Sequence, residues 1–254
     1  MKTIQPLFFA AILILFFFSC RKKDNNSPEQ EKEVLLTKIS TSSTTTSYEY
    51  DGQRRAVKSK VAYASSPVND YTSTYAYNDK DQLTEWYIDP EDPARDATRI
   101  IMTYNSGGQM VMSETYTVNS STATLAVKLI ATYSQGKIAI NQTDYPAGTS
   151  HLEVEYFTDA KGNLTKQISH RPDGSEWITT EYLEYDHHPA SGSSLPQTTF
   201  YKNANNYLSA KSTDHETGGV SNSTYSYEYN DKGYPVKRTI SGSGAITAYE
   251  YIFQ

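Results

Sequence analysis

A tyrosine-rich pattern that recurs about every 27 residues constrains the fold of this chain more than any other feature. Residues 225–240 show it most fully, because Tyr225, Tyr227 and Tyr229 alternate with polar residues before Asn230–Gly233. Alternation with a period of two is typical of a strand that buries one face. Asn at the first position of a turn, and Gly at the fourth, predict a tight β-hairpin.

The same turn recurs along most of the chain. The positions that align with Gly233 lie 27, 27, 28 and 26 residues apart between Arg54 and Gly162. A period this regular indicates a repeat architecture with one supersecondary unit per repeat, and two strands of roughly 8–10 residues with their turns account for its length. The predicted turn residues are Asp51, Asn78, Asn105, Gly108, Gly136, Asp159, Gly162, Asn230 and Gly233.

One interval departs from the period. Gly162 and Asn206 are 44 residues apart, and we place the extra residues near Asp186–Gln197. His187-His188-Pro189 and the Ser-rich run that follows do not continue a strand pattern. The segment 186–206 is therefore either a long loop in place of a tight turn or an additional pair of strands.

The strand pattern predicts an all-β fold with two unlike faces. Tyr and aliphatic residues gather on one face of each strand, and Glu, Lys and Ser gather on the other. We expect an antiparallel meander of about 14–16 strands, because each repeat supplies one hairpin. A meander with one apolar face should curl and close into a porin-like barrel, since closure removes the exposed sheet edges.

The N-terminal residues resemble a bacterial lipoprotein signal. Lys2 precedes an apolar run from Leu7 to Phe18, and Cys20 follows it. This run is short for a transmembrane helix, and Cys20 is the only cysteine in the chain. We expect cleavage before Cys20 and lipidation of its thiol, with the membrane as partner. The alternative is an ordinary secretion signal with an incidental cysteine.

The domain limits follow from this interpretation. Residues 1–20 are the signal, residues 21–33 are a charged and polar tether, and residues 34–254 are one repeat-built domain. The expected location is the outer membrane of a bacterial envelope. Arg21-Lys22-Lys23-Asp24 also resembles signals for export to the cell surface, so periplasmic and surface exposure both stay open.

The Tyr-x-Tyr-Asn/Asp-x-x-Gly units resemble the YD repeats of RHS-type proteins over most of residues 44–252. Those proteins build large shells that enclose a polypeptide, and this chain is too short for one. With its leader, the chain looks more like uncharacterised bacterial lipoproteins whose domain of unknown function has a porin-like fold. That resemblance implies a closed antiparallel barrel and no defined activity.

The sequence supplies no convergent catalytic or metal-binding motif. Two weak metal candidates are the loop histidines His187-His188 and the acidic segment Asp89–Asp96, and neither has a ligand spacing that metal sites use. We therefore predict no metal, no cofactor and no catalytic residue. Trp86 and Trp177 are expected to pack within the sheet, with stacking on sugars as the alternative.

These observations favour a non-enzymatic, lipid-anchored envelope protein that acts as a binding or structural module. A glycan or a peptide is the candidate ligand, and it would bind at the end of the sheet with variable loops or in a barrel cavity lined by Tyr hydroxyls. The net charge of −6 argues against nucleic acid as a partner. A glycan hydrolase with two carboxylates and a transmembrane barrel are the alternatives. The latter requires an outward apolar band, which the polar strand faces do not supply.

Overall fold

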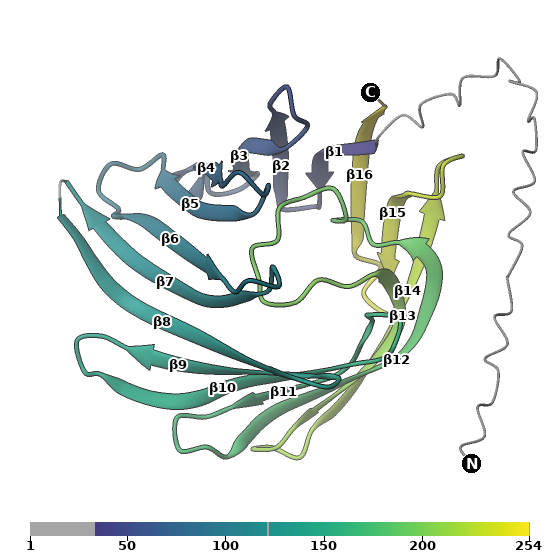
Figure 1. The fold of residues 1–254 in the computed structure, drawn as a ribbon. Helices are drawn as coiled ribbons and strands as arrows, with labels where there is room; N and C mark the ends of the chain where they lie inside the picture. The colour runs from purple at the N-terminus through teal and green to yellow at the C-terminus, as the bar shows by residue number, and fades with distance from the viewer. Residues whose placement is uncertain (1–33, 121, 254) are drawn as a thin grey trace, which may run out of the picture. The chain divides into compact units, whose positions relative to one another are not determined.

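The computed structural model describes residues 34–120 and 122–253. Sixteen antiparallel strands follow one another in sequence order, and β1 pairs with β16 to close the sheet into a barrel (Figure 1). The strands are β1 (Val34–Ser40), β2 (Thr44–Tyr50), β3 (Ala56–Tyr63), β4 (Tyr71–Tyr77), β5 (Leu83–Pro90), β6 (Ala97–Tyr104), β7 (Met110–Asn119), β8 (Thr122–Ser134), β9 (Lys137–Asp144), β10 (Thr149–Thr158), β11 (Leu164–His170), β12 (Glu176–Pro189), β13 (Asn205–Asp214), β14 (Val220–Tyr229), β15 (Pro235–Ile240) and β16 (Ile246–Phe253). The prediction of an all-β, antiparallel, closed meander is confirmed.

Helix is nearly absent from the described residues, which contain one 3-10 turn at Pro67–Asn69. Within residues 34–120 and 122–253, no helix is both long and apolar enough to cross a bilayer. The sequence's Thr, Tyr and Val content suits strands, since β-branched and aromatic side chains pack well on a pleated surface. The predicted signal, Cys20 and the tether 21–33 lie outside the described residues.

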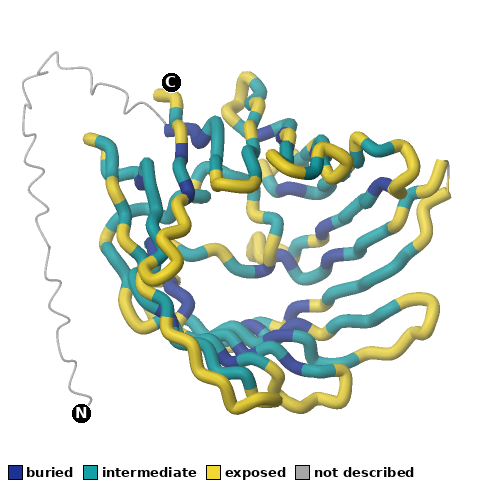
Figure 2. Tube along the Cα trace, turned by 180° about the vertical axis from the view of Figure 1, so that it is seen from behind, coloured by how far each residue is buried: buried dark blue, intermediate teal, exposed yellow. Residues whose placement is uncertain are grey.

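Two kinds of connection separate the two ends of the barrel. One end carries the tight turns between β2 and β3, β4 and β5, and so on around the ring. The other end carries the variable loops, such as residues 64–70 and 145–148. Figure 2 shows exposed residues in the connections at both ends and buried residues along the strands.

Backbone geometry explains the tight turns. In the hairpin β14–β15, Gly233 N donates to Asn230 O at 3.0 Å, and Asn230 N donates to Tyr234 O at 2.9 Å. The fourth position has positive φ throughout: 65° at Arg54, 58° at Asp81 and 79° at Gly233. A type I turn followed by a left-handed residue restores strand register, which is why Gly suits this position.

The segment 186–206 resolves as a long loop. β12 continues to Pro189, residues 190–204 contain no strand, and β13 begins at Asn205. We call residues 190–204 the plug, because this loop crosses the middle of the ring of strands (Figure 1). The alternative of an extra strand pair is wrong, because residues 190–204 form no strand. They pack inside the barrel instead, as the burial of Phe200 shows.

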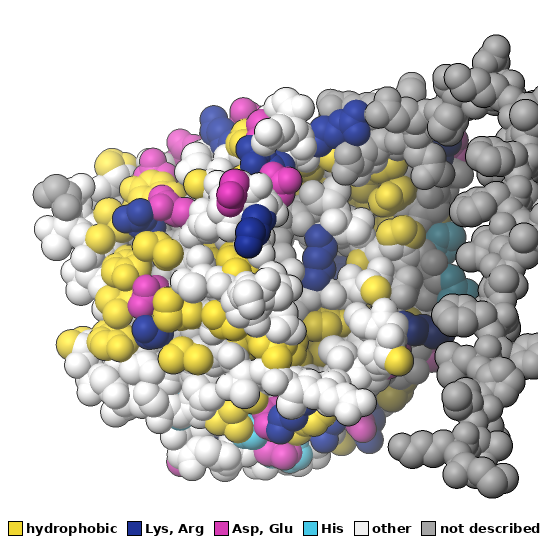
Figure 3. All heavy atoms as spheres, viewed as in Figure 1, with side chains coloured by type: hydrophobic (Ala, Val, Ile, Leu, Met, Phe, Trp, Pro, Cys, Tyr) yellow, Lys and Arg dark blue, Asp and Glu magenta, His cyan; other side chains and the backbone are white. Residues whose placement is uncertain are grey.

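The aromatic face of the sheet is the inner one. Phe200 of the plug packs in one buried cluster with Leu83, Met102 and Met110 of the wall, and Tyr201 stacks on Tyr156 at 5.9 Å. Figure 3 shows hydrophobic side chains gathered beside the loop that crosses the barrel. Strand alternation then places the intervening residues on the outer face.

The outer face is charged. Five ion pairs join residues that lie directly opposite each other on neighbouring strands: Lys38–Glu250, Lys58–Glu49, Lys128–Glu114, Lys211–Glu181 and Lys237–Glu228. Their N–O distances lie between 2.7 Å for Lys237–Glu228 and 3.8 Å for Lys211–Glu181. Opposite charges across a strand pair contribute modestly to sheet stability.

Candidate functional site

The tight turns share a side-chain cap that explains the Asn or Asp of the repeat. The Oδ1 atom of Asp159 accepts hydrogen bonds from Lys161 N at 2.9 Å and Asn163 N at 2.8 Å. Asn230 makes the same pair of bonds to Lys232 and Tyr234. Asp51 and Asn78 also cap their turns in this way. The short polar side chain thus satisfies two backbone donors where the strands separate.

The Tyr that precedes the cap links one hairpin to the one before it. Tyr77 Oη donates to Ala56 O at 2.6 Å, and Tyr104 Oη donates to Leu83 O at 2.8 Å. Tyr50, Tyr133, Tyr185 and Tyr251 make equivalent bonds to carbonyls at the start of an earlier strand. Burial raises the pKa of Tyr104, so its hydroxyl stays protonated and donates. The Tyr residues of the repeat therefore hydrogen-bond consecutive hairpins to each other.

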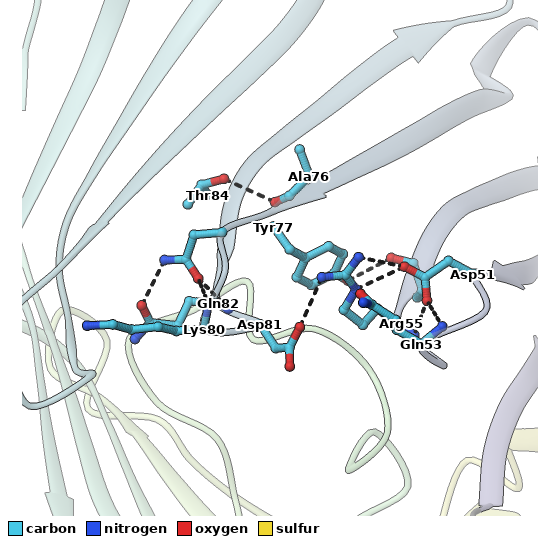
Figure 4. A network of polar contacts seen from close by, with 11 residues as sticks. Asp51, Gln53, Arg55, Ala76, Tyr77, Lys80, Asp81, Gln82 and Thr84 are labelled. Carbon is cyan, nitrogen blue, oxygen red and sulfur yellow. Dashed lines mark hydrogen bonds and ion pairs between the residues drawn. The ribbon is translucent and has the colours of Figure 1, made fainter.

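Charged side chains add a second link between turns. Arg55 bridges Asp51 and Asp81, with N–O distances of 2.8 Å and 2.9 Å, and its guanidinium lies 5.0 Å from the centre of the Tyr77 ring (Figure 4). In the same view, Gln82 contacts the cap of its own turn. These contacts hold the tight-turn end together around β2–β5.

Asp186 caps the hairpin that contains the plug in the same way. Its Oδ1 accepts from His188 N at 3.0 Å and from Asn206 N at 3.1 Å. The second donor lies 4 residues after Asp159 but 20 residues after Asp186, so this hairpin holds 16 more residues than an ordinary one, and the plug makes up 15 of them. Asn206 aligns with Asn163 and not with Gly162, which corrects the predicted alignment by one residue.

The plug is tied to the barrel wall by several polar contacts. Ser194 Oγ accepts from Leu36 N at 3.1 Å, and Leu164 N donates to Asn203 Oδ1 at 3.1 Å. Within the plug, Lys202 Nζ donates to the carbonyls of Ser193 and Leu195 at 2.7 Å and 2.9 Å. Burial lowers the pKa of Lys202. The plug is thus an integral part of the barrel interior.

A cavity of about 230 Å³ remains between the plug and the wall of β2–β5. Its walls combine aromatic rings, hydroxyls and the tip of the plug: Thr46, Tyr48, Ser59, Val61, Tyr71, Ser73, Tyr75, Trp86, Leu195, Pro196 and Thr198. Tyr71 begins β4 next to a variable loop, whereas the plug enters from the tight-turn end. The cavity therefore lies on the variable-loop side of the plug. We call it the lumenal cavity.

The polar groups that line the lumenal cavity are unusual. Its lining contains no charged residue. Tyr75 Oη and Ser59 Oγ are 2.9 Å apart, and the Tyr75 and Trp86 rings stack with centroids 6.3 Å apart. Trp86 Nε1 and Ser73 Oγ are buried without a hydrogen-bond partner among the described residues. Buried polar atoms are nearly always paired, so a water molecule or a ligand in the cavity would supply the partner that these two atoms lack.

The weaker candidates from the sequence occupy structural roles. His188 stacks on Tyr229 with ring centroids 4.0 Å apart, and it does not face His187 across a common site. Asp92 caps its own turn through Ala94 N at 3.0 Å, and Glu91 pairs with Lys60 at 3.1 Å. In the described parts of the chain, no group of three or more His, Cys, Asp or Glu side chains is arranged to hold a metal ion.

The sequence suggested a barrel cavity lined by Tyr hydroxyls, and Tyr48, Tyr71 and Tyr75 do line the lumenal cavity, but sequence reasoning missed most of its other residues. It singled out Trp86, but not Ser59, Ser73 or the plug residues Leu195 and Pro196. The one usable signal was the apolar content of residues 195–200, because a solvated surface loop has little reason to carry Leu195 and Phe200. The position of Leu195 and Phe200 inside the barrel depends on closure of the sheet around them.

These features define a closed, porin-like β-barrel with an internal plug. A porin-like protein from Bacteroides vulgatus ATCC 8482 has a similar fold, with a TM-score of 0.57 and 12% sequence identity over 87% of this chain and 99% of that chain. A second porin-like protein, from Bacteroides uniformis ATCC 8492, aligns over 87% of this chain and 96% of its own, with 11% identity and a TM-score of 0.39.

The first of these similarities shows the fold alone, because its sequence identity is low. No protein-family model and no curated protein matches the chain. The expected porin-like architecture is confirmed, while no finding supports the resemblance to YD repeats of RHS-type proteins. The repeat in this chain rests on its own caps and Tyr hydrogen bonds.

Proposed function

We propose that this protein is a lipid-anchored barrel of the bacterial envelope that binds a small neutral ligand in its lumenal cavity. The observation that carries the proposal is a cavity with aromatic walls, no charged lining residue and two buried polar atoms without partners. Ligand sites typically combine an apolar lining with a few polar groups that fix orientation.

The lining selects the chemistry of the ligand. Trp86 Nε1 is a donor only, so it requires an acceptor oxygen, and Ser73 Oγ can donate or accept. Burial raises the pKa of Tyr48, Tyr71 and Tyr75, which keeps their hydroxyls neutral. A volume of about 230 Å³ is smaller than the ~300–1,000 Å³ of sites for drug-sized molecules. One sugar ring or one uncharged peptide side chain matches these conditions.

We propose that the barrel does not span the bilayer. The outer face of the barrel is charged, and the ion pairs Lys128–Glu114 and Lys211–Glu181 lie within their strands and not at the strand ends. A membrane barrel presents an apolar band there, and each Lys near the bilayer centre costs about 2–4 kcal/mol. Extraction in carbonate buffer tests this point, because a delipidated barrel should be released and a spanning barrel should stay in the membrane.

The anchor is the second element of the proposal. Cys20→Ala should prevent lipidation, and the protein should then move from the detergent phase to the aqueous phase in a detergent partition. An unmodified N-terminus on the mature native protein would contradict the anchor without affecting the cavity. Periplasmic and surface exposure are distinguished by protease treatment of intact cells.

The binding experiment exploits the two Trp residues of the chain. Trp86 lines the lumenal cavity, whereas Trp177 lies elsewhere on β12. In a Trp177→Phe variant, Trp86 is the single fluorescent indole, and a panel of neutral saccharides and uncharged peptides should change its emission. Ser73→Ala should weaken this binding by about 5–10-fold, as expected for loss of one hydrogen bond. Unchanged Trp86 emission and unchanged melting with every ligand would refute the lumenal site.

The proposal treats the protein as a binding module and not as an enzyme. Hydrolysis of a glycosidic bond ordinarily uses two carboxylic acids on opposite sides of the bond. The lumenal cavity has none in its lining. Turnover of a saccharide in the same assay, abolished by Ser73→Ala, would overturn this part of the proposal.

A further inference from the structure

A second hollow lies at the variable-loop end of β9–β12, away from the lumenal cavity. Its volume is about 420 Å³, and we call it the loop groove. The lining residues come from the ends of four strands and from two loops, and they are Gln142, Asp144, His151, Glu153, His170, Arg171, Pro172, Trp177 and Glu216. None of them belongs to the lumenal cavity or to the repeat caps.

Trp177 gives the groove an aromatic platform. The register between β11 and β12 shifts at this point, because Ser169 pairs with Ile178 while His170 pairs with Glu176. Trp177 is the extra residue of this bulge, and 46% of it is exposed. Bulges re-aim side chains and are common beside binding sites. An exposed indole that lines a groove has the flat apolar face that can stack on another ring.

His170 supplies the observation that points to a ligand. Its side chain is 7% exposed, and both ring nitrogens are buried without a hydrogen-bond partner among the described residues. Nε2 lies 3.4 Å from Glu155 Oε2, which is close enough for ion pairing but lacks hydrogen-bond alignment. Nδ1 has no such neighbour in the described structure, which is unusual for a buried imidazole that lines a hollow.

Most charged groups of the groove already have polar partners. His151 Nε2 contacts Glu153 at 3.0 Å, and Arg171 contacts Glu216 at 3.1 Å. Gln142 Nε2 donates to Asp144 Oδ1 at 2.8 Å. The carboxylates of Asp144, Glu153 and Glu216 outnumber the one guanidinium of this lining, so an anionic ligand is disfavoured. A neutral ligand with several hydroxyls can instead use the free lone pairs of the carboxylates.

We propose that the loop groove is a saccharide-binding site that holds one neutral pyranose ring without cleaving it. The ring face packs on the Trp177 indole, its hydroxyls donate to Glu153 and Asp144, and one hydroxyl meets a nitrogen of His170. This site goes beyond the lumenal cavity, and either site can exist without the other.

The test uses the mature full-length protein and the methyl glycosides of glucose, galactose and mannose, with glucuronic acid as a charged counterpart. Isothermal titration should show binding of at least one methyl glycoside and at least tenfold weaker binding of glucuronic acid. Trp177→Ala should reduce the affinity by at least tenfold. Leu183→Ala, which removes an exposed apolar side chain of the same strand that lines neither hollow, should leave this binding unchanged.

Folding is checked for each variant by circular dichroism and melting temperature. Since Trp177 is exposed, its replacement should leave both unchanged; His170→Gln retains a polar side chain and should lower the affinity about threefold or more. The proposal is overturned if no methyl glycoside binds, if Trp177→Ala binds like the wild type, or if glucuronic acid binds better. Release of a free sugar from a bound glycoside would overturn the non-catalytic assignment.

Discussion

The hairpins β12–β13 and β14–β15 open with the same pattern, a Tyr followed by Asp or Asn, and then diverge. Tyr229-Asn230 leads into a turn that closes within four residues, whereas Tyr185-Asp186 leads into the plug. Both caps bind the donor two residues on and a donor at the start of the return strand. The cap therefore fixes only the point where the two strands separate and the point where they meet again. The residues between these points are free to acquire another role.

The two hairpins also contact each other. Tyr229 Oη donates to Asp186 Oδ2, and His188 stacks on the Tyr229 ring. The regular hairpin therefore supports the entrance of the plug. Four perturbations follow, ordered from the largest expected effect to the smallest.

Removal of the plug's buried anchor should have the largest effect. Phe200→Ala deletes a side chain that is 7% exposed within the cluster of Leu83, Met102 and Met110. The free energy of unfolding should fall by roughly 3–5 kcal/mol, the usual range for Phe→Ala in a core. Urea denaturation measures it. The control is Phe157→Ala, which removes an outer-face ring between Lys137 and Lys166 and should cost less than half as much.

Loss of the plug's cap should cost more than loss of an ordinary cap. Asp186→Ala removes the acceptor for His188 N, Asn206 N, Asn206 Nδ2 and Tyr229 Oη. We expect a destabilisation of roughly 2–3 kcal/mol, since several buried donors lose their partner. Asp159→Ala removes only the two turn bonds and should cost about 1 kcal/mol. Equal losses in the two variants would show that Asp186 acts as an ordinary turn cap.

Glycine replacement separates backbone strain from contact with the plug hairpin. Gly233 and Gly162 both have positive φ, 79° and 82°. A Cβ at Gly233 would lie 3.0 Å from His188 Nδ1, whereas a Cβ at Gly162 meets nothing within 4 Å. Gly162→Ala should cost about 1 kcal/mol through strain alone. Gly233→Ala should cost about 1 kcal/mol more, because His188 has to move. Thermal melts of the two variants provide the comparison.

The pH dependence of the caps should be the smallest effect. Hydrogen bonds from backbone N–H groups, that of Asn163 first, lower the pKa of Asp159 in the folded state. A carboxyl with a depressed pKa stabilises the fold above its unfolded value of about 3.9, and this contribution is lost as pH falls through the folded value. Asp159→Asn should thus flatten the decline of the melting temperature below about pH 4. Asn230→Asp should steepen it.

The repeat determined more of this protein than any single motif did. The caps Asp51, Asn78 and Asn230, and the left-handed fourth position, depend on residues within one turn, so the spacing alone predicts the repeated hairpins of the tight-turn end. The alternation of Tyr with Glu and Lys depends on the period of a strand, so it also predicts which residues share a face. Because neighbouring hairpins must pair somewhere, an antiparallel meander followed from these local rules.

Only the tertiary structure decided what the inner face encloses. Whether residues 190–204 lie on the surface or inside the ring depends on the space left when β1 meets β16, and no local pattern records that space. The lumenal cavity likewise joins Trp86 to Leu195 across more than a hundred residues of chain. Local hydrogen bonds set the turns of this protein, whereas closure of the barrel set its core, its plug and its candidate sites.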